Sequence, residues 1–187
     1  LLQSFNSFAC YHHDFAEFTT QPGEEVLGLC QSWTLGNETE LWVNTVELVQ
    51  DEMSHHSNWT FVPDDKYDGP DGVWPCDDRG YDQLSAAVAG GVLYAQSTQA
   101  TREVQKFPEG AAVRIPPHAR IIGDVHLGNA SDLCSGIGDA LAIMASDEGV
   151  DFTKLRSGGH DSKRRVFQRS IVMFDINENG HYATPIS

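Results

Sequence analysis

Short runs that alternate apolar and polar residues fill positions 26 to 62 and limit the folds open to this chain. The runs read VLGLCQSWTL, LWVNTVELV and SNWTFV, and a Gly36-Asn37 turn signal separates the first two. A period of two places every second side chain on the same face of a strand, where it can be buried. The pattern predicts antiparallel sheet, and 187 residues are enough to bury a substantial core.

A loop and further strand-like segments follow. Residues 63–80 are rich in Asp, Gly and Pro, which predicts a long loop with solvated carboxylates; a calcium site is the alternative. QLSAAVAGGVLYAQ predicts a short helical turn before a strand, and FPEGAAVRIPPHARIIGDVHLGN predicts two more strands around a Pro-Pro corner.

Four cysteines are widely spaced, and none forms a Cys-x-x-Cys pair. They are Cys10, Cys30, Cys76 and Cys134. This spacing favours two disulfides over a zinc knuckle, and disulfides indicate an oxidising compartment, either extracellular or periplasmic. Four free buried thiols are the alternative.

The charge of the chain excludes some partners. A net charge of -15 argues against nucleic acid, because the surface would repel phosphates. No apolar run approaches the roughly twenty residues of a membrane span. The net charge is -17 over residues 1–150 and +2 over residues 151–187, which predicts a separate role for the end of the chain.

Three histidines lie in strand-like segments: His55 and His56 in SHHSNWTFV, and His126 in IIGDVHLGN. Neutral imidazoles suit copper and zinc equally, so converging strands would make a metal site. Adjacent residues of a regular strand point to opposite faces. His55 and His56 can therefore share one metal only at a bulge, a twist or a strand end, and a chance pair is the alternative.

A second candidate metal site lies near the end of the chain. Asp175, Asn177 and Asn179 precede Gly180 with the spacing that opens a calcium-binding loop. Ile186 stands where such a loop has its bidentate glutamate, and an ordinary Asn-Gly turn is the alternative.

Five segments in order carry a family resemblance: LGLCQSWTL, VELVQDEMSHHSNWTFV, GVWPCDDRG, YAQSTQATREVQKFPEGAAVRI and IIGDVHLGN. Together, over about residues 26–130, they resemble the first domain of the copper type II, ascorbate-dependent monooxygenases. That family contains the peptidylglycine α-hydroxylating and dopamine β-monooxygenases. The segments HHSNW and DGPDGVWPCDDRG resemble the corresponding segments of its bacterial members more than those of its animal members.

The resemblance implies an all-β fold, an antiparallel β-sandwich of jelly-roll type over residues 26–140. An N-terminal arm (1–25) and a short irregular C-terminal extension (141–187) would flank it. It also implies that His55, His56 and His126 are the ligands of the family's electron-transfer copper. Cys30 would pair with Cys76, which leaves Cys10 and Cys134 for a second bridge.

The chain also departs from the family. The family's catalytic copper lies in a second domain and is held by a His-x-His pair and a Met; this chain has no His-x-His, and the residues after His126 are too few for a second sandwich. We therefore expect an incomplete hydroxylase at most, or one piece of a larger enzyme.

Two functional hypotheses follow from these features. The first is a secreted copper protein that exchanges an electron with a reductant or redox partner. The second is an extracellular structural module that self-associates through strand edges, with copper incidental or absent. The apolar N-terminal arm would pack on a neighbouring subunit or, equally, cover its own sheet.

Overall fold

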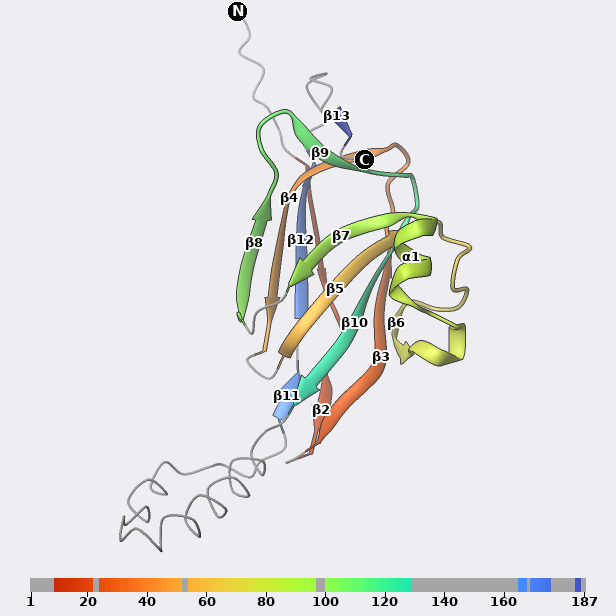
Figure 1. The fold of residues 1–187 in the computed structure, drawn as a ribbon, viewed down its shortest axis with the longest axis vertical. Helices are drawn as coiled ribbons and strands as arrows, with labels where there is room; N and C mark the ends of the chain where they lie inside the picture. The colour runs from red at the N-terminus through yellow and green to blue at the C-terminus, as the bar shows by residue number, and fades with distance from the viewer. Residues whose placement is uncertain are drawn as a thin grey trace, which may run out of the picture.

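The computed structural model describes residues 9–21, 24–51, 54–96, 100–128, 165–167, 169–175 and 184–185. Nearly all of these residues lie in or between strands, which form two main sheets and one small ribbon (Figure 1). The expectation of an all-β fold built from antiparallel sheets is therefore confirmed.

The first sheet has six strands. Its order is β1 (Ala9–Asp14), β12 (Arg169–Asp175), β4 (Leu41–Gln50), β9 (Ala111–Ile115) and β13 (Thr184–Pro185), and β8 (Arg102–Lys106) also pairs with β4. All of these pairs are antiparallel except the parallel contact of β9 with β13.

The second sheet has five strands, all antiparallel, and carries the predicted histidine segments. Its order is β6 (Gly72–Pro75), β3 (Glu25–Thr34), β10 (Arg120–Gly128), β5 (Ser54–Val62) and β7 (Gly91–Gln96). A separate ribbon pairs β2 (Phe18–Thr20) with β11 (Arg165–Phe167). The 3-10 turn η1 (Cys76–Arg79) and the helix α1 (Gln83–Ala89) complete the described elements, and α1 confirms the predicted helical turn.

Apolar side chains from the two sheets meet in one core, so the sheets form a sandwich. The six-stranded sheet contributes Leu41, Val43, Val46, Leu48, Ile171 and Met173, and the five-stranded sheet contributes Trp59, Phe61, Leu93, Tyr94 and Ile121. Alternation produces this arrangement: along β12 every second residue is buried.

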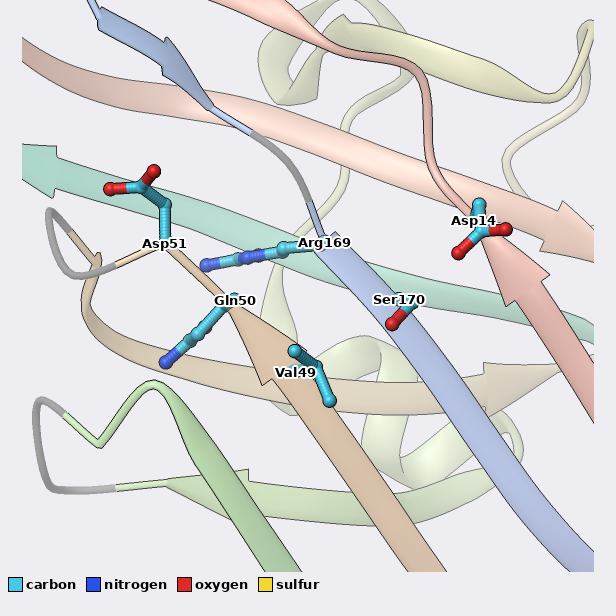
Figure 2. A pocket seen from close by; sticks show the side chains of 6 residues that line it. All are labelled: Asp14, Val49, Gln50, Asp51, Arg169 and Ser170. Atoms are coloured by element: carbon cyan, nitrogen blue, oxygen red, sulfur yellow. The ribbon is translucent and has the colours of Figure 1, made fainter.

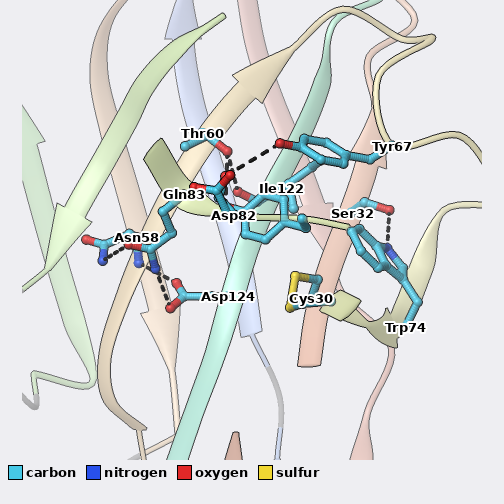
Figure 3. Close-up of a disulfide and its surroundings, with 12 residues drawn as sticks. Cys30, Ser32, Asn58, Thr60, Tyr67, Trp74, Asp82, Gln83, Ile122 and Asp124 are labelled. Atoms are coloured by element: carbon cyan, nitrogen blue, oxygen red, sulfur yellow. Dashed lines mark hydrogen bonds between the residues drawn. A yellow bond between two sulfur atoms is a disulfide. The ribbon is translucent and has the colours of Figure 1, made fainter. Parts of the chain in front are cut away.

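The outer face of the five-stranded sheet is covered as well. A second cluster packs Ile122 of β10 and Val62 of β5 against Ala86 of α1 and residues of the Asp-rich loop. Cys30 of β3 forms a disulfide with Cys76 of η1 beside this cluster (Figure 3). The bridge closes a loop with a sequence separation of 46, which stabilises the folded state by about 4 kcal/mol in the chain-entropy model.

The ends of the chain contribute more to the sandwich than the sequence indicates. Strand β12 lies between β1 and β4, and two of its side chains, Ile171 and Met173, are fully buried. Residues 169–175 of the expected irregular extension are thus a core strand, and residues 9–14 of the expected arm pair with it. The expectation of an irregular extension is wrong for this strand. Every second side chain of β12 is buried, and this burial needs the opposite sheet of the sandwich.

Gly123 of β10 offers a test of this packing. A Cβ atom at this position would lie 2.5 Å from ring atoms of Trp59, which is fully buried. We expect Gly123→Ala to lower the free energy of unfolding by about 1–3 kcal/mol in chemical denaturation. Gly36→Ala is the control, since a Cβ at Gly36 would meet nothing within 4 Å. Equal losses in both variants would contradict this account of the core.

Candidate metal centre

His56 on β5 and His126 on β10 lie directly opposite each other in the five-stranded sheet. Nε2 of His56 and Nδ1 of His126 are 3.3 Å apart. The rings meet edge to face, with centroids 4.5 Å apart and planes at 89°. These two side chains, called the histidine pair below, bring together residues that are seventy positions apart in the chain.

His55 occupies an irregular position in the backbone of β5. His126 pairs with His56, but the next residue of β10, Leu127, pairs with Ser54. His55 is therefore the extra residue of a β-bulge, the kind of irregularity that two adjacent histidines need in order to approach one metal. Its side chain lies outside what the structure describes.

Strand β3, the other neighbour of β10, also has an irregularity beside His126. Between the Val125–Leu29 pair and the Leu127–Val26 pair, β3 contains one more residue than β10. Gly28, at φ 72°, lies within this bulge and adopts the left-handed conformation that glycine tolerates best. The β10 histidine is thus flanked by a bulge on each side.

Glu25, the first residue of β3, contacts the other side of the His126 ring. Its Oε1 atom lies 3.3 Å from Nε2 of His126. The His126 side chain is 21% exposed and that of Glu25 is 60% exposed, so this contact lies at the rim of the site. No feature of the sequence pattern singled out Glu25, because a carboxylate at the start of a strand usually faces solvent.

A cavity of about 270 Å³ opens beside the histidine pair. Its polar lining includes Gln83, at the start of α1, and Asp124, two residues before His126. One oxygen of Asp124 accepts from the backbone N–H of Asn58 at 2.8 Å and the other from Nε2 of Gln83 at 2.8 Å (Figure 3). Both oxygens of this carboxylate are hydrogen-bonded, so the side chain is held in place where it lines the cavity.

Tyr81 lines the same cavity and is almost completely buried. Its hydroxyl lies 3.3 Å from Oγ1 of Thr60. Burial raises the pKa of Tyr81 to about 12. The phenol therefore stays protonated throughout the physiological pH range.

The buried guanidinium of Arg169 supports the site from the opposite sheet. Nη1 donates to the backbone carbonyl of Asp124 at 2.7 Å, and Nη2 donates to Oγ of Ser54 at 3.2 Å. Arg169 also lines a second cavity, of about 310 Å³, with Gln50 and Asp51 at the end of β4 (Figure 2). Burial lowers the pKa of Arg169 to about 10, so the side chain still carries its charge at neutral pH.

The spacing of the histidine pair fits a transition metal. Two nitrogens bound about 2.0–2.1 Å from one tetrahedral ion lie roughly 3.3 Å apart, and the pair has this separation. Within the described parts of the chain, no group of three or more His, Cys, Asp or Glu side chains is placed to hold a metal. The described donors are therefore two, and the third predicted donor is His55.

The other predicted site residues have mixed outcomes. The Cys30–Cys76 disulfide is present. Cys10 is exposed and forms no disulfide with a described residue, and Cys134 lies outside the described residues, so their pairing stays a prediction. Asp175 ends β12 and accepts a hydrogen bond from the backbone N–H of Trp42 at 2.9 Å. The calcium site also stays a prediction, because Asn177 and Asn179 lie outside the described residues.

No protein-family model matches the chain, and no curated protein sequence matches it.

The buried phenol of Tyr81 can be tested through the pH dependence of stability. Because its pKa is about 12 in the folded chain and 10.0 in the unfolded chain, the unfolded state loses this proton first. Stability should therefore fall as the pH rises from about 10 to 12, by on the order of 2 kcal/mol from this group. Denaturation curves of Tyr81→Phe should lack this component. An identical alkaline loss in the variant would show that Tyr81 does not titrate in this way.

Proposed function

We propose that this chain is a metal-binding β-sandwich whose histidine pair, completed by His55, binds one copper ion. The observation that carries the proposal is the 3.3 Å separation of the two ring nitrogens on strands that each adjoin a bulge. Bulges are enriched next to functional sites, where they redirect a side chain.

The identity of the metal rests on chemistry and on the family resemblance. Imidazoles bind both copper and zinc. The five sequence segments, in their order along the chain, favour copper because they resemble an electron-transfer copper domain. A copper ion supplies one-electron exchange with a reductant or a redox partner. The chain itself would orient two imidazoles and keep a neutral phenol in the lining of the adjoining cavity.

The remaining features are compatible with a secreted protein. The Cys30–Cys76 disulfide suits an oxidising compartment. Within the described ranges, no helix has the length and apolar character needed to cross a membrane. The acidic surface disfavours nucleic acid as a partner.

Substitution of His126 tests the proposal. After loosely held metal is removed, we expect one copper per chain with nitrogen hyperfine structure in its EPR spectrum. His126→Ala removes one of the two described nitrogens and should lower copper affinity by more than the roughly 10- to 100-fold that loss of an outer-shell partner causes. Affinity is measured by competition with a chelator.

His118→Asn is the matched control for that variant. His118 is about half exposed, lies 3.5 Å from Glu38, and has φ 55°, a conformation that asparagine tolerates. It should retain full copper affinity. Copper binding that survives in His126→Ala, or that falls equally in both variants, would exclude the histidine pair as the site.

A structural module is the second candidate function, and the position of β1 favours it. Strand β1 is at the edge of the six-stranded sheet and pairs with β12 alone among the described strands. Cys10 is exposed on this edge. An open edge can accept a strand from another copy of the chain.

Analytical ultracentrifugation of the metal-free protein tests this second candidate. If β1 joins two copies, the apparent mass should rise with concentration, and Cys10→Ser should remove any part of the association that reductant also removes. A monomer at all concentrations would exclude it.

A further inference from the structure

We infer that Glu25 is a positioning residue, which fixes the proton of His126 on Nε2 and so keeps a lone pair on Nδ1 with which this nitrogen can bind the metal. The inference rests on the proposed function, because it names the group that prepares one of its two described ligands. Nothing in the family resemblance assigns a role to this residue.

The contact with Glu25 determines which nitrogen of His126 donates and which accepts a hydrogen bond. An ionised carboxylate can only accept, so at 3.3 Å from Oε1 of Glu25 the Nε2 atom of a neutral His126 carries the proton. Nδ1 is then an acceptor, and the N–H at Nε2 of His56, 3.3 Å away, donates to it. Glu25, His126 and His56 thus form one chain of hydrogen bonds, in which Nδ1 of His126, the nitrogen that a metal would take, accepts from His56 in the metal-free protein.

The bulge in β3 explains why Glu25 reaches this face of the sheet. Val26 and Leu29 pack in the same apolar cluster as Val125 and Leu127, although residues three apart in a regular strand lie on opposite faces. The extra residue at Gly28 reverses the alternation beyond it. Glu25, next to Val26, therefore lies on the face opposite this cluster.

His126 lies on that same face. It stands between Val125 and Leu127 on β10, and both of these side chains point into the cluster. Without the bulge, Gly128 would pair with Val26; with it, Gly128 pairs with Glu25, which sets the carboxylate diagonally across from His126. The irregular backbone thus has a chemical consequence, since it brings a carboxylate to the ligand ring.

A carboxylate bonded to the far nitrogen of a ligating histidine has a known physical effect. It holds the tautomer and the orientation of the ring and raises the basicity of the ligating nitrogen, and its loss typically costs 10- to 100-fold in metal affinity. In the metal-loaded chain His56 would carry its proton on Nδ1, so that both facing nitrogens present lone pairs.

The tautomer of His126 can be read in the metal-free protein by nitrogen-15 NMR of the imidazoles, at a pH where both rings are neutral. We expect the wild-type ring to be protonated at Nε2. Glu25→Ala should shift the ring toward a mixture of tautomers, whereas Glu25→Gln, which keeps an acceptor oxygen, should restore the Nε2–H form. A merely structural role would leave the tautomer unchanged.

Copper affinity is measured on the same variants by chelator competition. Glu25→Ala should bind copper about 10- to 100-fold more weakly than the wild type. Glu24→Ala is the matched control: it removes the same charge one residue away, from an exposed side chain that bonds to the backbone N–H of Gln21. It should change neither the tautomer nor the affinity.

The two measurements separate the two claims. An unchanged tautomer in Glu25→Ala, or equal losses of affinity in Glu24→Ala and Glu25→Ala, would overturn the role of Glu25 even if copper binds. A wild-type chain that binds no copper would overturn the proposed function, while the NMR experiment would still decide whether Glu25 sets the tautomer.

Discussion

The guanidinium of Arg169 joins the two sheets at the level of the candidate metal centre. It extends from β12 and donates to the carbonyl of Asp124 and the hydroxyl of Ser54, each two residues before one member of the histidine pair. A buried cation is costly unless it is hydrogen-bonded, so these contacts are strongly constrained. Strands β5 and β10 are thereby held in register by a residue from the opposite sheet.

The site also depends on two irregularities in the five-stranded sheet. A regular ladder would place His55 and His56 on opposite faces and would put Glu25 with the apolar residues of β3. The structure has one extra residue in β5, at His55, and one in β3, near Gly28, and the second of these places Glu25 on the face of His126. Bulges disrupt local pairing, and the Cys30–Cys76 disulfide and the packed cluster on the outer face hold the same sheet together.

The same architecture accommodates both candidate functions, because they use different parts of it. The proposed metal binding would use the outer face of the five-stranded sheet, where the histidine pair adjoins a cavity. Self-association uses the β1 edge of the six-stranded sheet. The imidazole pair favours the first function, since two facing ring nitrogens beside a carboxylate form a specific arrangement, whereas an edge strand is common in sandwiches.

Local elements could be predicted from the residues: alternation predicted strands over residues 26 to 62, and QLSAAVA predicted the short helix. The sequence also predicted that His55, His56 and His126 would converge, and the structure brings His56 and His126 together. Three features could be seen only in the folded protein: β3, β4 and β5 alternate between two sheets, β12 is a core strand, and Glu25 faces His126. The physical reason is that alternation reports which side chains are buried along one strand, whereas strand order and bulges are set by long-range pairing.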